Sequence, residues 1–389
     1  MQRIEIQQIK KIKHLYMYSK ETDCVYNRQQ HQGVNTPIYT STANRYIGYE
    51  EILYPRNFNT ENQLAIVEKL CRLEQAEAGM IFSSGAAAIS TVLFSFLKAG
   101  DHVLFSQEIY GGTVKLVVEE FAKFNIAYDF VSGAAMENIG AMIRENTRLI
   151  YTETPSNPLL SVVDLEQVSR VAKKHGILSV VDNTFATPIN QNPIALGIDI
   201  VLHSGTKYLG GHHDLCFGVV VTSQQLKDAI YPSALNFGGS LNGLDCYLIE
   251  RSLKTLALRV EKQNNNALQL AKALQENPAI GRVYYPGLPE HPNHAIAARQ
   301  MKKGFGGMLS FELKDTSRTA AFLNRLQLII PALSLGGVDS TICQPATSSH
   351  ASLSEQERQE QGITEGLLRL SVGIESAGDL LHDIESALA

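Results

Sequence analysis

Short apolar runs recur along the first part of the chain, and helical patterns lie between most of them. Five of these runs end near residues 82, 105, 152, 181 and 202, and one more covers residues 217–222. A short apolar run bounded by turn residues is typical of a strand that is buried on both faces of a sheet. The alternation of strands and helices therefore predicts an α/β fold with a mainly parallel central sheet between helices.

Longer patterns with helical spacing predict where the chain leaves this alternation. Residues 61–77 repeat apolar side chains at helical spacing, which predicts a helix before the first strand. A longer helical pattern over residues 244–266 predicts a connector to a C-terminal domain, in which residues 308–313 and 367–374 have the pattern of strands. We therefore expect an extended N-terminal arm, a large domain and a smaller α+β C-terminal domain, at residues 1–60, 61–245 and 246–389.

Two strand ends carry the groups with the most distinctive chemistry. Asp182 ends one apolar run, and Lys207 follows the next run after a few small polar residues. A buried carboxylate needs a cationic partner, and burial that lowers the pKa of a lysine makes its amine a nucleophile for a Schiff base. A carboxylate for a pyridinium nitrogen and a lysine for an imine are what pyridoxal 5′-phosphate, PLP, requires. A structural ion pair between Asp182 and Lys207 is the alternative that these two residues leave open.

The segments around both strand ends resemble motifs of a known protein family. The resemblance is carried by the segments 181–185 (Val-Asp-Asn-Thr-Phe) and 204–208 (Ser-Gly-Thr-Lys-Tyr), followed by Gly211 and His212. These motifs resemble the Cys/Met-metabolism family of fold-type I PLP-dependent enzymes. That family includes cystathionine γ-synthase, cystathionine γ- and β-lyases, methionine γ-lyase and O-acylhomoserine sulfhydrylases. The resemblance extends from about Tyr39 to the C-terminus and implies the fold-type I architecture.

The resemblance also implies a PLP site built from several strand ends. Lys207 and Tyr110 are the residues that it implies in catalysis, and the hydroxyls of Ser204 and Thr206 suit phosphate oxygens. The residues implied to hold the cofactor are Lys207, Asp182, Tyr110, Gly85, Ala86, Ser204, Thr206, Asn157, Tyr54 and Arg56.

Individual motifs explain these assignments. The strand at residues 80–82 and the helix predicted after it are joined by a turn of small residues, an arrangement that binds anions at the helix N-terminus. The resemblance places the backbone of Gly85 and Ala86 at the PLP phosphate. Tyr110 precedes two glycines and is by itself an ordinary aromatic at a turn, whereas the resemblance implies a ring stacked on the pyridine. Asn157 is implied to lie near the phenolic oxygen of the cofactor.

Tyr54 and Arg56 lie in a segment with few periodic signals. Two residues apart in an extended segment, they point to the same side and suit a phosphate group, although an ordinary surface arginine is the simpler interpretation. The segment resembles a family motif that reaches into the active site of a neighbouring subunit. The resemblance therefore implies a homodimer as the minimal unit and a homotetramer as the expected assembly. Thr60 departs from the motif, which usually has proline there.

Arg369 lies between apolar residues in a predicted strand and needs a partner there. A substrate α-carboxylate matches its guanidinium in bidentate fashion, and an edge-strand arginine facing water is the alternative. The resemblance implies that Arg369 binds this carboxylate, with Ser334 beside it and Asn157 also near the substrate. Leu333 stands where several cystathionine-handling members have glutamate, which disfavours cystathionine, and Gly112 stands where methionine γ-lyases usually have cysteine.

Two histidines near these motifs have no assigned role. His350 matches a loop histidine of the family, and His213 replaces a serine that the family usually has. The neighbouring histidines at 212 and 213 are not expected to bind a metal, because adjacent histidines seldom point at one ion and no further ligand set is evident.

Composition narrows the class of protein further. The 389 residues are 44% hydrophobic and 19% charged, with a net charge of −5, so no general attraction to nucleic acid or to an anionic membrane is expected. Five scattered cysteines without a CxxC pair predict neither a metal site nor a disulfide framework. No apolar run approaches the roughly 20 residues of a membrane span, and residues 1–13 contain no apolar core of a secretory signal. We expect a cytoplasmic protein.

These observations favour a PLP-dependent carbon–sulfur lyase of sulfur amino-acid metabolism. The expected reaction is β- or γ-elimination on cystathionine, methionine or a related amino acid. A γ-replacement transferase, either a cystathionine γ-synthase or an O-acylhomoserine sulfhydrylase, is the alternative, because the same chemistry at the α-carbon serves both reactions. A catalytically silent binding protein with a PLP fold is a second alternative, which the intact Lys207, Asp182 and Arg369 oppose.

Overall fold

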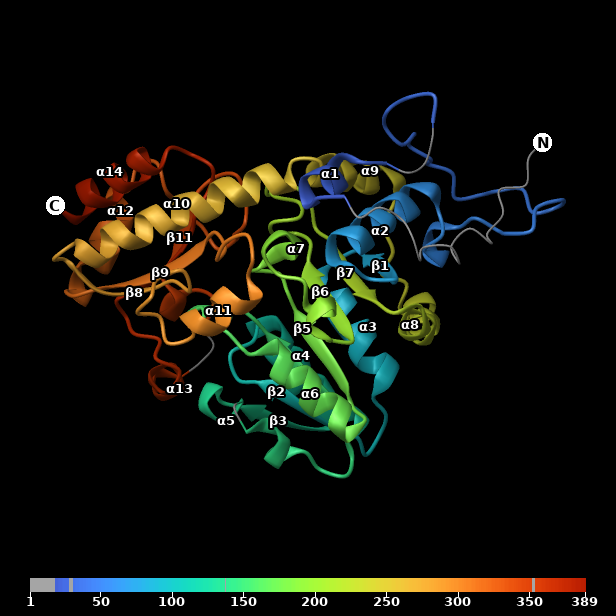
Figure 1. Cartoon of the computed structure of the whole chain (residues 1–389), viewed down its shortest axis with the longest axis horizontal. Coiled ribbons are helices and arrows are strands. Elements are labelled where there is room, and N and C mark those ends of the chain that lie inside the picture. The colour runs from blue at the N-terminus through green and yellow to red at the C-terminus, as the bar shows by residue number, and fades with distance from the viewer. Residues whose placement is uncertain (1–17, 28–30, 137, 352–353) are drawn as a thin grey trace.

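A seven-stranded sheet forms the centre of the larger part of the protein (Figure 1). The computed structural model describes residues 18–27, 31–136, 138–351 and 354–389. The strand order is β1-β7-β6-β5-β4-β2-β3, and β7 runs antiparallel to β1 and β6 while the other neighbours are parallel. The predicted mainly parallel sheet is therefore confirmed. Its strands are β1 (Ala78–Phe82), β2 (His102–Ser106), β3 (Ala127–Val131), β4 (Thr147–Glu153), β5 (Leu178–Asp182), β6 (Ile200–Ser204) and β7 (Gly218–Thr222).

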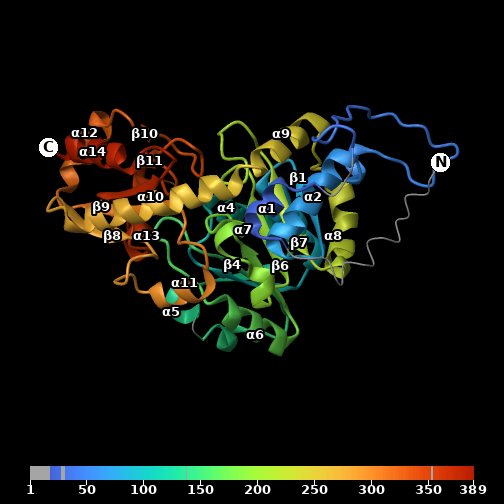
Figure 2. The same ribbon diagram turned by 45° about the horizontal axis from the view of Figure 1, so that its top comes forward.

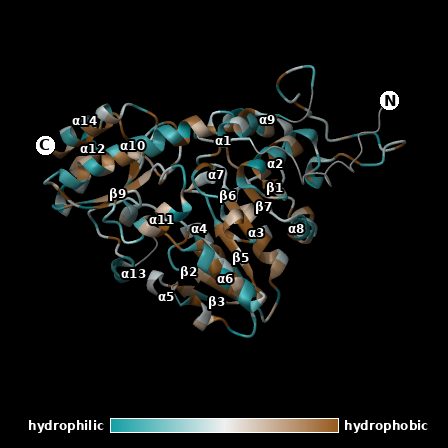
Figure 3. Cartoon of the chain, in the orientation of Figure 1, coloured by the Kyte–Doolittle hydropathy of each residue, from teal (hydrophilic) through white to brown (hydrophobic). Residues whose placement is uncertain are grey.

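The sheet is buried on both faces because alternate side chains of its strands enter two separate apolar clusters. Val181 and Val201 belong to one cluster, and Val180 and Leu202 belong to the other. Figure 3 shows these strands as hydrophobic ribbons behind the more hydrophilic helix α6 (Leu165–His175). Burial on both faces explains why the sequence shows these strands as continuous apolar runs.

Helices cover both faces of the sheet. Helices α2 and α6 pack on the cluster that contains Val181, and α3, α4 and α8 pack on the opposite cluster. The helices of this part are α1 (Lys20–Val25), α2 (Glu61–Glu74), α3 (Gly85–Phe96), α4 (Gly111–Glu120), α5 (Gly133–Met136), α6, α7 (Thr187–Asn190), α8 (Gln224–Phe237) and α9 (Gly243–Leu253).

Helix α2 begins at a capping box that explains one departure from the family motif. Thr60 is the N-cap residue, and its backbone N–H donates to Oε1 of Gln63 at 3.1 Å. Proline has no backbone N–H, so it would leave this acceptor without its donor. Thr60 therefore fits a helix start that uses Gln63 in place of a proline turn.

A second, five-stranded sheet forms the smaller part of the protein, with the order β10-β11-β12-β9-β8. Helices α10, α12 and α14 pack together against it, and α10 runs from the large sheet to this one (Figure 1). Its strands are β8 (Ile280–Tyr284), β9 (Met308–Leu313), β10 (Ile330–Pro331), β11 (Thr341–Cys343) and β12 (Leu367–Ser371). Its helices are α10 (Leu256–Glu276), α11 (His294–Gln300), α12 (Thr319–Arg325), α13 (Glu355–Glu360) and α14 (Ala377–Leu388).

The single helix predicted over residues 244–266 is wrong in its extent. The structure has two helices there, α9 and α10, separated at Lys254 and Thr255. The carbonyl of Ser252 accepts hydrogen bonds from the N–H of Thr255 at 3.3 Å and from Nη2 of Arg259 at 3.0 Å. Because these bonds replace the regular helical bond at that carbonyl, α9 ends although the apolar periodicity continues.

The described residues 31–54 contain no helix or strand and project from the body in two views (Figures 1 and 2). Several large apolar side chains of this arm are exposed, among them Val34 at 91% and Ile47 at 80%. Among the described residues, no helix combines the length and apolar character that crossing a membrane requires. All five cysteines are free.

Candidate active site

Asp182 and Lys207 follow neighbouring parallel strands and meet at the same edge of the sheet. Asp182 ends β5, opposite Leu202 of β6, and Lys207 lies in the turn after β6, where its N–H donates to the carbonyl of Ser204 at 3.1 Å. Ligands of such sheets bind beyond the carboxyl ends of the strands. The structure therefore brings these two residues to the edge at which a ligand is expected.

The carboxylate of Asp182 is buried, and Oδ1 accepts from the backbone N–H of Thr184 at 3.0 Å. Burial raises the pKa of Asp182, while the hydrogen bonds from Thr184 lower it. The charge of Lys207 is not among the causes that shift the pKa of Asp182, and the two side chains form no ion pair within the described chain. The structural ion pair that the sequence leaves open is therefore not formed, and Asp182 is available to a cation from outside the chain.

The amine of Lys207 has a lowered pKa. Burial is the main cause, and the positive charge of Arg369 adds to it. A lowered pKa increases the fraction of neutral amine, which is the form that attacks a carbonyl carbon and accepts a proton.

The N-terminus of α3 lies against the end of β6. A Cβ added to Gly85 would lie 3.1 Å from the Cα of Ser204, so glycine permits this close approach. The N–H groups of Gly85 and Ala86 belong to the first helical turn and have no intrahelical acceptors, whereas Ala87 donates to the side chain of Ser84. Ser204, Gly85 and Ala86 thus lie together, as an anion site requires.

The hydroxyl of Thr206 is occupied by the backbone of Phe217. It accepts from the N–H of Phe217 at 3.2 Å and donates to the carbonyl at 3.4 Å. These bonds connect the lysine turn to the start of β7. A contact of Thr206 with phosphate stays a prediction.

Tyr110 is the N-cap residue of α4 and is 54% exposed. The ring lines a cavity of about 370 Å³ together with Ala86. The N–H of Tyr110 donates to Oε2 of Glu153 at 2.7 Å. Glu153 is opposite Asp182 in the sheet, and burial together with the charge of Asp182 raises its pKa well above the usual range. Glu153 is not among the predicted cofactor or substrate residues, although it ends β4 as Asp182 ends β5.

Arg369 and Asn157 meet in the buried interior between the two sheets. Nη1 of Arg369 donates to Oδ1 of Asn157 at 2.9 Å, and Nη2 donates to the carbonyl of Leu333 at 3.1 Å. The guanidinium is buried, with 4% of the residue exposed, and it forms no ion pair with a carboxylate in the described parts of the chain. The alternative of an arginine facing water is therefore wrong.

The other predicted substrate residues, Leu333 and Ser334, lie on one loop, and the carbonyl of Leu333 contacts this guanidinium. Leu333 is 66% exposed. The carbonyl of Ser334 accepts a hydrogen bond from the hydroxyl of Thr341 at 2.8 Å. His350 is buried, and burial, reinforced by the charge of Arg369, lowers its pKa to about 4. His213 has a left-handed φ of 58°, and a Cβ added to Gly337 would lie 2.0 Å from its ring. The ring of His213 therefore packs against the loop that carries Leu333.

Tyr54 and Arg56 lie apart from these residues. Nη1 of Arg56 donates to the carbonyl of Leu235 in α8 at 3.1 Å, and its guanidinium carbon lies 5.7 Å from the ring centroid of Tyr54. Both side chains are exposed. The structure does not bring them to Lys207 of the same chain.

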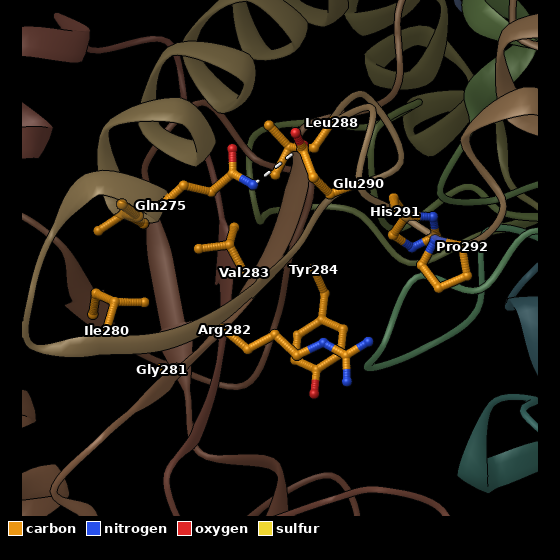
Figure 4. A pocket seen from close by; sticks show the side chains of 11 residues that line it. Gln275, Ile280, Gly281, Arg282, Val283, Tyr284, Leu288, Glu290, His291 and Pro292 are labelled. Atoms are coloured by element: carbon orange, nitrogen blue, oxygen red, sulfur yellow. Dashed lines mark hydrogen bonds between the residues drawn. The ribbon is translucent and has the colours of Figure 1, made fainter.

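A separate cavity of about 250 Å³ lies in the smaller part of the protein, between α10 and the segment after β8 (Figure 4). Arg282 lies beside the ring of Tyr284, and Gln275 donates to Glu290 at 3.4 Å. None of the predicted site residues lines it. No group of three potential metal-binding side chains is found among the described residues.

Comparisons with known proteins agree with this geometry. Residues 21–389 match the model of the family described as Cys/Met metabolism PLP-dependent enzyme. The chain is 46% identical over 359 residues to a cystathionine beta-lyase of Lactococcus lactis subsp. cremoris (strain MG1363), which covers 91% of this chain and 94% of that protein. It is 45% identical over 362 residues to a cystathionine gamma-lyase of Bacillus subtilis (strain 168), with coverage of 91% and 94%.

A methionine lyase and a solved structure are also similar. The chain is 44% identical over 324 residues to an L-methionine gamma-lyase of Fusobacterium nucleatum, with 82% of each chain covered. The crystal structure of a cystathionine gamma-lyase from Lactobacillus plantarum complexed with L-serine has a TM-score of 0.91 and 38% identity, and covers 95% of this chain and 98% of that one. The chain therefore belongs to the family of Cys/Met metabolism PLP-dependent enzymes.

Proposed function

We propose that this PLP-dependent carbon–sulfur lyase eliminates a sulfur-containing group from L-cystathionine. The observation that carries the proposal is the buried guanidinium of Arg369, whose hydrogen-bond partners among the described residues are neutral oxygens. A buried charge without a counter-ion is unfavourable, and the carboxylate of an amino acid would supply one. Relatives named cystathionine lyases at 46% and 45% identity support the choice of amino acid.

The residues at the strand ends fit PLP. Asp182 is a buried carboxylate that forms no ion pair in the described parts of the chain, and the N-terminus of α3 lies beside Ser204 because Gly85 has no Cβ. When bound, PLP withdraws electron density from the α-carbon of the substrate. Asp182 is proposed to hold the proton on the ring nitrogen, Tyr110 to stack on the ring, and the backbone of Gly85 and Ala86 to hold the phosphate.

Arg369 is proposed to bind the substrate, and Lys207 is proposed to transfer protons. Arg369 binds the α-carboxylate, and Asn157 orients the guanidinium through the bond of 2.9 Å. This fixes the α-carbon near the amine of Lys207, which takes its proton and returns a proton as the carbon–sulfur bond breaks. The lowered pKa of Lys207 supports this role, because a neutral amine accepts the proton.

Methionine is the second candidate substrate. Leu333 offers an apolar, 66% exposed side chain next to Arg369. A methylthio group makes favourable contact with such a side chain, whereas the distal ammonium of cystathionine gains nothing from it. This observation favours γ-elimination of methionine at the expense of cystathionine.

A second copy of the chain is proposed to complete the site. Arg56 and Tyr54 are exposed, and in the described part of their own chain Arg56 contacts the ring of Tyr54 and the carbonyl of Leu235 in α8. The exposed apolar side chains of the same arm support its burial against another copy. The minimal unit is then a homodimer, and a homotetramer is expected.

Product analysis tests the proposed reaction. The purified protein with PLP is incubated separately with L-cystathionine, L-methionine, homocysteine and O-acylhomoserines, and the products are identified by mass spectrometry. β-Elimination of cystathionine gives homocysteine, pyruvate and ammonia, whereas γ-elimination gives cysteine, 2-oxobutanoate and ammonia. Turnover only of an O-acylhomoserine with a thiol would overturn the proposal in favour of γ-replacement.

A further inference from the structure

Three buried polar side chains lie on one face of α10. Arg259, Gln263 and Asn266 are spaced by four and three residues, which places them on the same side of a helix. Their exposed fractions are 4%, 0% and 0%. Figures 1 and 2 show α10 running from the side of the large sheet to the smaller one, so this row of donors extends along the junction of the two parts.

The first donor holds the turn that carries the lysine. Nη1 of Arg259 donates to the carbonyl of Tyr208 at 2.7 Å, and Nη2 lies 3.4 Å from the carbonyl of Leu209. Tyr208 directly follows Lys207. The guanidinium also donates to Thr255 and Ser252, so it connects the backbone after Lys207 to the junction of α9 and α10. Every acceptor among the described residues is an uncharged oxygen.

The second donor holds the loop that carries Leu333. Nε2 of Gln263 donates to the carbonyl of Gly337 at 2.7 Å. The preceding residue, Gly336, has φ of 77°, and a Cβ there would lie 2.8 Å from the nitrogen of Tyr208. The loop therefore lies directly on the lysine turn, and only glycine fits this contact and this conformation.

The same loop reaches the guanidinium that is proposed to bind the substrate. Its other end offers the carbonyl of Leu333 to Nη2 of Arg369. The third donor, Asn266, bonds to the carbonyls of Gly373 at 3.1 Å and Glu375 at 2.8 Å, just after the strand of Arg369. One helix face thus contacts the lysine turn, the intervening loop and the end of β12.

We propose that Gln263 is a positioning residue, and that the row Arg259, Gln263 and Asn266 on α10 fixes the separation of Lys207 from Arg369. This inference rests on the proposed roles of those two residues. The Oε1 atom of Gln263 is buried and has no hydrogen-bond partner in the described chain, so the amide is held through its NH₂ group, which bonds to Gly337. Removing this donor frees the loop, and with it one support of the Arg369 guanidinium.

The test compares Gln263→Met with Asn264→Leu. Methionine keeps the length of Gln263 but cannot donate to Gly337. Asn264 is the next residue of the same helix and is also buried, but its amide bonds to Asn190, Lys303 and Gly306, none of which is a candidate site residue. The control therefore removes a buried amide from α10 without touching the lysine turn or the Leu333 loop.

Gln263→Met is expected to raise KM for L-cystathionine about tenfold, the effect of one lost hydrogen bond, with a smaller change in kcat. The cofactor-free protein gives a second measurement, in which hydrogen exchange over residues 333–338 is faster in Gln263→Met than in Asn264→Leu. Equal KM values and equal exchange in the two variants would overturn the proposal. Should Gln263→Met not fold, Gln263→Glu, which opposes a carboxylate to the Gly337 carbonyl, is measured in the same way.

Arg369→Ala separates this inference from the proposed function. If Arg369→Ala leaves KM unchanged, the proposed carboxylate site is wrong, and the exchange of residues 333–338 alone decides whether Gln263 holds the loop. If Arg369→Ala raises KM while Gln263→Met does not, the site stands and the positioning role is wrong.

Discussion

Asn157 accepts a hydrogen bond from Arg369 at 2.9 Å, although 212 residues separate them along the chain. The bond joins the loop after β4 of the large sheet to β12 of the smaller sheet. A substrate carboxylate at Arg369 would therefore be held by both parts of the protein at once.

Arg369→Ala is expected to weaken amino-acid turnover severely while leaving the visible absorbance of the bound cofactor intact. Loss of a charge-assisted, desolvated contact costs about 2–5 kcal/mol in comparable cases. The measurement is kcat/KM for L-cystathionine, together with the absorbance spectrum. Arg282→Ala removes an exposed arginine from the separate cavity and is expected to leave both unchanged. Equal activity of the two variants would contradict the role of Arg369.

Borohydride reduction is expected to attach the cofactor covalently to Lys207. The buried amine with a lowered pKa after β6 is the physical reason. Peptide mapping by mass spectrometry after reduction identifies the labelled lysine, and Lys207→Ala serves as the control that takes up no label. A label on any other lysine would show that the site is assigned wrongly.

Two inactive variants are expected to restore activity together. In a hybrid dimer of Lys207→Ala and Arg56→Ala chains, one site combines the intact Lys207 of one chain with the intact Arg56 of the other. Activity is measured after the chains are unfolded together and refolded, and native mass spectrometry verifies that hybrids form. Hybrids without activity would place Arg56 in the site of its own chain.

Leu333→Glu is expected to shift selectivity toward cystathionine and away from methionine. The added carboxylate attracts the distal ammonium of cystathionine, whereas methionine has only a methyl group there. Because Leu333 is 66% exposed, solvent screens the added charge and the ratio of kcat/KM values should change about two- to fivefold. Leu258→Glu, on a leucine of α10 that is 68% exposed, is the matched control and should leave the ratio unchanged. A ratio moved toward methionine would remove Leu333 from the distal pocket.

His291 is expected to make the protein less stable in mild acid. Burial lowers its pKa from 6.5 to about 4, so between these values the unfolded chain binds a proton that the folded chain does not. The free energy of unfolding therefore falls as pH decreases from about 6.5 to about 4 and loses this dependence below that range. The measurement is Tm against pH for the wild type and His291→Gln, which should show a shallower decrease. Equal slopes of Tm against pH in the two proteins would contradict the lowered pKa of His291.

The sequence reveals the strands and the groups at their ends because each strand is buried on both faces. In the sequence, an apolar run ends in the carboxylate of Asp182, and in the structure Asp182 is the last residue of β5. The sequence pattern does not predict the edge strand β3, because Tyr128 and Asp129 are only half-buried and interrupt the apolar run. The domain limits at residues 60 and 245 stay predictions.

The donors on α10 could not be predicted in the same way. Gln263 and Asn266 are polar residues in a helix, a pattern that indicates a solvent-facing side, yet both are buried. Their partners are backbone carbonyls more than 70 residues away, and no residue type marks a carbonyl that needs a donor. Family motifs locate the chemistry, whereas contacts of this kind depend on the tertiary structure.

The row of donors constrains the number of residues in this segment of α10 more than it constrains which residues stand between the donors. Exposed residues between the donors, such as Glu261, Lys262 and Asn265, contact solvent and are open to substitution. A single inserted residue between Arg259 and Gln263 would turn every later donor by about 100° and advance it by about 1.5 Å. Gln263 and Asn266 would then face away from Gly337 and Gly373. Across relatives of this chain, this segment should therefore vary by substitution and not by insertion or deletion.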